Sequence, residues 1–222
     1  MWKYLKLFLE RKIIAEQCNI RKNNIPIEYD ILNNNNSLSN KMDIFSIYFN
    51  KNKEKKYKIV LDTETTGFVG DIIQLAYIIV DNDNNIIEKV DDFIKDRIPT
   101  NKSTEIHLIT TNDLREKGIE FTTSIKKFLS HLEQCKTFIG HNIAFDIKTI
   151  LRNIRKFDIN IVYENNVIYD IFEGINIVCT CTMSNKTKLE TLYEKLNGKK
   201  FENAHNAMND VIATFECYKK LT

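Results

Sequence analysis

The stretch YKIVLDTETTG, residues 57–67, begins as a buried β-strand and ends with two carboxylates, Asp62 and Glu64. Residues two apart on a strand share one face and lie roughly 6–7 Å apart, so both acids point the same way, opposite to Thr63. Two carboxylates that close repel each other, and burying them without partners is costly. Solvation at the strand end would relieve the repulsion, and so would a bound divalent cation, since hard oxygen ligands suit Mg²⁺ or Mn²⁺.

The pattern around this strand predicts an α/β fold with a mixed sheet flanked by helices. Short polar gaps separate the strand at 57–64 from two further apolar runs, so the three strands should be antiparallel neighbours. After them, strands alternate with helices, which favours helices on both faces of the sheet. The expected later strands are 71–82, 86–96, 136–142 and 175–183. The expected helices are 123–135, 144–157 and 188–198, and a final helix ends with residues 209–221.

Composition separates an extension from this domain. The chain has 222 residues, long enough for one full domain and an appendage, and its net charge of +2 does not by itself indicate a nucleic-acid binder. Asn- and Lys-rich clusters at 31–41 and 50–58 predict a linker. We therefore divide the chain into an extension, 1–55, with an amphipathic helix at about 2–17, and a domain at 56–222.

The chain carries neither an apolar run of the roughly 20 residues that a membrane span needs nor a signal-peptide pattern. Its 5 cysteines lack zinc-site spacing, and Cys179 and Cys181 should share one face of a strand as reduced thiols. The expected location is intracellular, cytoplasmic or nuclear, without a membrane partner.

Two further acids and a histidine are placed to join Asp62 and Glu64. Asp146 lies in the first turn of a helix that directly follows a strand, with Asn142 or a neighbour as the expected cap. Asp210 shares a helix stripe with Ala207 and Thr214, and a small residue at 207 would let that helix lie close to the sheet. His205 precedes this helix, where the chain could turn toward the acids. Four carboxylates and a histidine are what two-metal phosphodiester hydrolysis requires.

Three segments of this set resemble the motifs of the DEDDh exonuclease family. The segments IVLDTETTG, IGHNIAFD and HNAMNDVIAT match in order, spacing and predicted secondary structure. The segment EIHLIT, residues 105–110, is similar to another family segment, which normally has Gly where this chain has Leu108. The sister group has Tyr four residues before the last acid, whereas this chain has Asn206 there. The tract at 188–205 looks like the branch of the bacterial polymerase III proofreading (epsilon) subunit.

The resemblance implies a ribonuclease H-like fold with a five-stranded mixed sheet and hydrolysis from a 3′ end to 5′-mononucleotides. It implies that two Mg²⁺ or Mn²⁺ ions bind Asp62, Glu64, Asp146 and Asp210, and that His205 is the general base. The expected substrate-binding residues are Thr65, Thr66, Gly67, Phe68, His107, Ile109, Asn142 and Phe145.

Several alternatives stay open at this stage. The substrate is nucleic acid with a single-stranded or frayed 3′ end, with DNA favoured and RNA trimming as the alternative, because the motifs do not determine recognition of a 2′-hydroxyl. A catalytically silent nucleic-acid- or partner-binding module is the competing function. Residues 1–55 are a candidate binding segment for a protein partner.

Overall fold

The computed structural model describes residues 46–164, 166–168, 170–202 and 204–222. Its centre is a five-stranded mixed sheet with the order β4-β3-β2-β5-β8. The strands are β2 (Tyr57–Thr65), β3 (Ile72–Val80), β4 (Ile86–Phe93), β5 (Cys135–Gly140) and β8 (Asn176–Cys179). β2, β3 and β4 form the predicted antiparallel meander, and β5 and β8 add to it in parallel. The predicted mixed α/β fold with a five-stranded sheet is confirmed.

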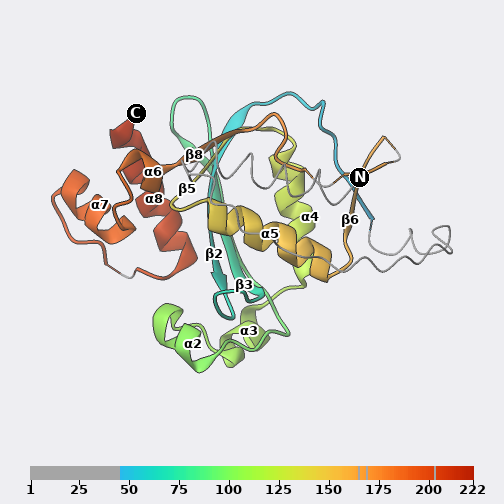
Figure 1. The fold of residues 1–222 in the computed structure, drawn as a ribbon, viewed down its shortest axis with the longest axis horizontal. Helices are drawn as coiled ribbons and strands as arrows, with labels where there is room; N and C mark the ends of the chain where they lie inside the picture. The colour runs from blue at the N-terminus through green and yellow to red at the C-terminus, as the bar shows by residue number, and fades with distance from the viewer. Residues whose placement is uncertain (1–45, 165, 169, 203) are drawn as a thin grey trace, which may run out of the picture.

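Seven helices surround this sheet in the described part of the chain. α8 (Ala207–Leu221) covers one face of the sheet, and α4 (Phe121–Leu132) and α5 (Ala144–Lys156) cover the other (Figure 1). α2 (Asn101–His107) and α3 (Thr111–Lys117) lie together beyond the end of β2 and β3 (Figure 1). α6 (Thr180–Met183) and α7 (Leu189–Asn197) lie beside α8, and α7 ends at Gly198 in the left-handed conformation. Within the described ranges, no helix is both long and apolar enough to cross a membrane.

The alternation of side chains along β2 explains the two hydrophobic layers. Val60 faces α8 and packs in a cluster with Val211 and Phe215. Ile59 and Leu61 point the other way into the larger cluster, which holds apolar side chains of α4 and α5. Because β2 lies between these layers, its backbone is held rigidly on both faces, which fixes the direction of the acids at its end.

A second, three-stranded sheet was not predicted from the sequence. It has the order β1-β6-β7, formed by β1 (Ser46–Tyr48), β6 (Asn160–Tyr163) and β7 (Asn166–Ile168). β1 pairs in parallel with β6, and Phe49 beside it is 3% exposed in the main core cluster. Residues 46–49, which the sequence division assigned to the extension, therefore take part in the folded domain. The amphipathic helix predicted at 2–17 lies outside the described residues.

The structure corrects one local prediction and specifies another. The strand predicted at 175–183 ends at Cys179 and α6 begins at Thr180, so Cys181 is helical and the two cysteines do not share a strand face. The N-cap residue of α5 is Ile143, the neighbour of Asn142, and no side-chain capping bond forms there. Asn142 instead has φ 61°, and its carbonyl accepts the Phe145 N–H at 2.9 Å.

Candidate active site

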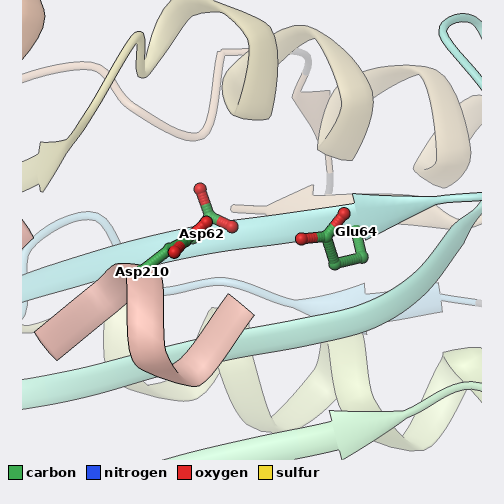
Figure 2. A group of neighbouring side chains, drawn as sticks. All are labelled: Asp62, Glu64 and Asp210. Carbon is green, nitrogen blue, oxygen red and sulfur yellow. The ribbon is translucent and has the colours of Figure 1, made fainter. Parts of the chain in front are cut away.

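Three carboxylates meet between the sheet and α8. Oxygen atoms of Asp62, Glu64 and Asp210 all lie within 4.8 Å of one another. Asp62 and Glu64 project from β2 and Asp210 from the first turn of α8, as Figure 2 shows. The spacing of two along the strand thus brings both acids to one face, as predicted, and the third acid arrives from a segment distant in the sequence.

Close packing of the first turn of α8 against the sheet brings Asp210 to this position. Ala207 is completely buried, and its N–H donates a hydrogen bond of 3.2 Å to Oε1 of Gln74 on β3. The Gln74 amide nitrogen donates in turn to Asp91 on β4 at 2.7 Å, which fixes the orientation of the amide. Gln74 was missed in the sequence, although a single polar residue in the buried run IIQLAYIIV was a usable signal. It anchors an end of α8 that would otherwise present unpaired N–H groups.

The electrostatics of the three acids favour a positively charged ligand. Burial and the neighbouring acids Asp146, Asp210 and Glu64 raise the pKa of Asp62 well above its ordinary value. Burial raises the pKa of Glu64 to about 8, with further contributions from Asp210 and Asp146. Burial also raises the pKa of Asp210 to about 7, against a hydrogen bond from the His205 backbone. The carboxylates therefore carry their charges together only at a high cost, which a cation would remove.

Asp146 lies beside this group without being one of the three. It is 2% exposed at the start of α5, and its Oδ1 accepts a 2.8 Å hydrogen bond from Thr63 Oγ1. β2 and β5 are parallel neighbours, so the end of β2 and the turn into α5 do meet at one edge of the sheet, as the sequence analysis required. Burial raises the pKa of Asp146 to about 7, although the Thr63 hydrogen bond opposes the shift. Thr63 was missed as a partner of Asp146, because the sequence indicated only that it faces away from Asp62 and Glu64.

His205 stands at the entrance to α8, where the sequence analysis placed it. It adopts φ 64°, immediately before the N-cap residue Asn206, whose side chain accepts the Asn209 N–H at 3.3 Å. Its side chain is 51% exposed, and Nε2 lies 3.6 Å from Glu190 Oε1 on α7. In this conformation the imidazole is directed to α7 and is not one of the groups that meet within 4.8 Å.

The residues expected to receive a nucleotide begin at the end of β2. Thr65 Oγ1 donates to the Gly67 carbonyl at 2.8 Å, and a Cβ at Gly67 would lie in ordinary contact with the Thr100 side chain, 3.8 Å away. Phe68 is 86% exposed, and its ring centroid lies 6.1 Å from that of Phe145 on α5. An exposed aromatic ring is a surface on which a base could stack.

The segment from His107 to Ile109 is held by its own hydrogen bonds. His107 is 5% exposed, and its Nδ1 accepts the Ile109 N–H at 3.0 Å. Burial lowers the pKa of His107, so the ring is neutral near pH 7. Ile109 packs in a small cluster with Ile73 and Leu114. Leu108, between them, has φ 61° and is 76% exposed, so it occupies a left-handed position that favours glycine.

The three-carboxylate group fits a hard divalent cation. Its donors are all carboxylate oxygens, which are the ligands that Mg²⁺ and Mn²⁺ prefer. Oδ1 of Asp210 is buried and has no hydrogen-bond partner in the described part of the chain, although such an atom normally has one. A bound cation would both pair this oxygen and offset the mutual repulsion of the acids.

Comparison with known proteins gives the family. The model of the RNase_T family, described as exonuclease, matches residues 59–218. The chain belongs to this exonuclease family, which confirms the resemblance to the DEDD exonucleases and indicates a nuclease. A search of curated protein sequences gave no significant match.

Solved structures support the same fold at low sequence identity. A zinc-bound complex of E. coli exonuclease I with single-stranded DNA is 22% identical with a TM-score of 0.60, over 75% of this chain and 40% of that one. A full-length 3′-exonuclease is 17% identical with a TM-score of 0.56, over 74% of this chain and 60% of that one. The RNase domain of yeast Pop2 is 12% identical with a TM-score of 0.51, over 98% of this chain and 81% of that one. The matched region thus spans less than half the length of exonuclease I.

Proposed function

We propose that this domain is a divalent-metal-dependent 3′–5′ exonuclease that releases 5′-mononucleotides from nucleic acid, with DNA as the favoured substrate. The observation that carries the proposal is the meeting of Asp62, Glu64 and Asp210 within 4.8 Å, in a chain of the exonuclease family. Proofreading, repair and general nucleic-acid turnover are the processes that such a reaction serves.

Asp62, Glu64 and Asp210, with Asp146 beside them, are the residues that would hold Mg²⁺ or Mn²⁺, two ions in the full site. When bound, the ions would neutralise the carboxylates and stabilise the negative charge that develops on the phosphate. Thr63 would keep the Asp146 side chain in place through its 2.8 Å hydrogen bond. Gln74 would keep Asp210 in place by anchoring the end of α8.

His205 is the proposed general base, as in the DEDDh group. Imidazole can take a proton from water near neutral pH, and a base must come within hydrogen-bond reach of that water. The half-exposed side chain of His205 can leave Glu190, because a contact of 3.6 Å at the surface contributes little stability. The backbone at Gly67 and the Phe68 ring are proposed to seat the 3′-terminal sugar and base. His107, Ile109 and Asn142 would border that seat.

The test compares the wild-type protein with Asp62→Asn on single-stranded DNA and RNA oligonucleotides of one sequence. Each substrate is labelled at its 5′ end in one series and at its 3′ end in another, with Mg²⁺, Mn²⁺ or a chelator. We expect stepwise shortening from the 3′ end, release of 5′-mononucleotides, and a loss of at least about a thousandfold in Asp62→Asn, because charge stabilisation worth several kcal/mol is removed. The relative rates on the two substrates decide between DNA and RNA.

Asp83→Asn is the matched control, because Asp83 is an exposed acid in the turn between β3 and β4. It should leave the rate unchanged. Equal activity of Asp62→Asn and wild type would refute the proposed site. If Mn²⁺ raises the melting temperature but neither substrate is hydrolysed, the domain is a silent binding module instead.

A further inference from the structure

The loop between β2 and β3, residues 66–71, is closed by hydrogen bonds between its own ends. The Thr66 N–H donates to the Asp71 carbonyl at 2.8 Å, and the Asp71 N–H donates to Thr66 Oγ1 at 2.9 Å. The Gly70 N–H donates to the Gly67 carbonyl at 2.7 Å. A Cβ at Gly70 would lie 2.3 Å from Thr66 Oγ1, so the turn is closed too tightly to accept a side chain at this position. The 66–71 loop is therefore a compact unit whose position is decided by what holds it.

One side of α5 holds the end of this loop through three residues. Arg152 Nη2 donates to the Gly70 carbonyl at 2.7 Å, and Lys156 Nζ donates to Asp71 Oδ1 at 2.7 Å. Between them, Asn153 Oδ1 accepts the N–H of Ile72, the first residue of β3, at 3.1 Å. We call Arg152, Asn153 and Lys156 the α5 clamp.

The other side of the loop rests on α2 and the segment before it. The Thr66 carbonyl accepts the Thr100 N–H at 3.1 Å and Ser103 Oγ at 3.0 Å. Arg97 Nε lies 3.8 Å from Asp71 Oδ2, and its guanidinium lies over the Phe157 ring, 4.3 Å from the centroid. α2 and the residue before it thus hold the Thr66 end of the loop, and the α5 clamp and Arg97 hold the Asp71 end.

Arg152 is directed to the protein rather than to solvent. Besides the Gly70 carbonyl, Nη2 bonds Thr149 Oγ1 at 3.2 Å. Burial lowers the pKa of Arg152, so its guanidinium is partly withdrawn from water, where a hydrogen bond from a charged donor is worth more. An arginine used in this way supports backbone and does not need to contact a phosphate.

We propose that Arg152 is a positioning residue that sets the place of the 66–71 loop, and so of the 3′-terminal nucleotide, relative to the acids. The inference rests on the proposed function, which puts the nucleotide at residues 65–68. The α5 helix makes the link, because Asp146 lies in its first turn and the clamp lies further along the same rigid helix. A shift of about 1 Å in a bound substrate is enough to lower reactivity strongly.

The test measures kinetics of Arg152→Met on a single-stranded DNA oligonucleotide with Mn²⁺. We expect kcat to fall about tenfold, with a smaller change in KM and an unchanged Mn²⁺ concentration for half-maximal thermal stabilisation. Arg152→Lys should recover part of the loss, because an ammonium can still donate to the Gly70 carbonyl. Amide hydrogen exchange at residues 66–71 should be faster in Arg152→Met than in wild type. Arg115→Met, the same change at an exposed arginine on α3, is the control.

The outcomes separate positioning from direct contact. Loss of a phosphate contact would lower the slope of log KM against log salt by about one and leave amide exchange in the loop unchanged; that result overturns the proposal. An unchanged kcat overturns it as well. If wild type hydrolyses no oligonucleotide, the proposed function fails, while amide exchange in Arg152→Met still tests whether the clamp holds the loop.

Discussion

Replacing Glu64 with Gln should make the metal-free protein more stable at pH 8 while changing its stability little at pH 5. The pKa of Glu64 is raised from 4.5 to about 8 by burial and by its acidic neighbours. A raised carboxyl pKa means that the folded state binds more protons than the unfolded state, so stability falls as the pH rises from about 4.5 to about 8. Gln is uncharged, so its stability contribution does not change with pH.

The size of the effect follows from the two pKa values. The difference between 4.5 and about 8 corresponds to about 5 kcal/mol, at about 1.4 kcal/mol for each pH unit. Because Glu64 is partly exposed, we expect solvent screening to leave about 2 kcal/mol. For a domain of this size, that corresponds to roughly 4–8 °C in melting temperature.

The assay is thermal unfolding of both proteins in chelator at several values between pH 5 and pH 8. His107, His131 and His141 have lowered pKa values through burial, and their effect on stability runs in the opposite direction up to about pH 6.5. They are present in both proteins and cancel in the difference. Adding Mn²⁺ at pH 8 should stabilise wild type more than Glu64→Gln. A difference between the two proteins that is constant with pH would refute the electrostatic reasoning.

Two further predictions concern the fold. Leu108→Gly should raise the free energy of unfolding by about 0.5–1 kcal/mol in urea, because release of left-handed strain outweighs the greater entropy of the unfolded chain; a loss of stability would mean that Leu108 makes a contact worth more than the strain. Phe49→Ala should lower the free energy of unfolding by about 3–5 kcal/mol, because Phe49 is 3% exposed in the main core. A change within about 0.5 kcal/mol would show that the domain does not depend on residues before 56.

The sequence was sufficient wherever one periodicity persisted over a whole element. β2 and α8 are long enough to show which residues share a face, so the faces of Asp62, Glu64 and Asp210 followed directly. β3 is a continuous apolar run bounded by polar residues, which indicated a buried strand. The short connections between β2, β3 and β4 also indicated the antiparallel meander. These patterns determine which way each side chain points from its own helix or strand. The parallel pairing of β2 with β5 then brings the separate motifs to one edge of the sheet.

Short elements and tertiary contacts were beyond the same reasoning. β1 has 3 residues and α6 has 4, too few to show a period, and the run INIVCTCTM reads as one strand although it divides after Cys179. Hydrogen bonds such as Thr63 to Asp146 join residues 83 positions apart, and no local pattern encodes such a partner. The direction of His205 toward Glu190 depends on where α7 packs, which is likewise a property of the whole fold.

The division of the three carboxylates between β2 and α8 has a consequence for the order of events during folding. A chain that has formed only the β2–β3–β4 meander presents Asp62 and Glu64 but lacks Asp210, which joins them when α8 docks across the sheet. Contacts so distant in sequence form late, because closing a long loop costs entropy before the contact is gained. The proposed site is therefore complete only in the folded domain, and a chain in which α8 has not docked lacks one of its three carboxylates.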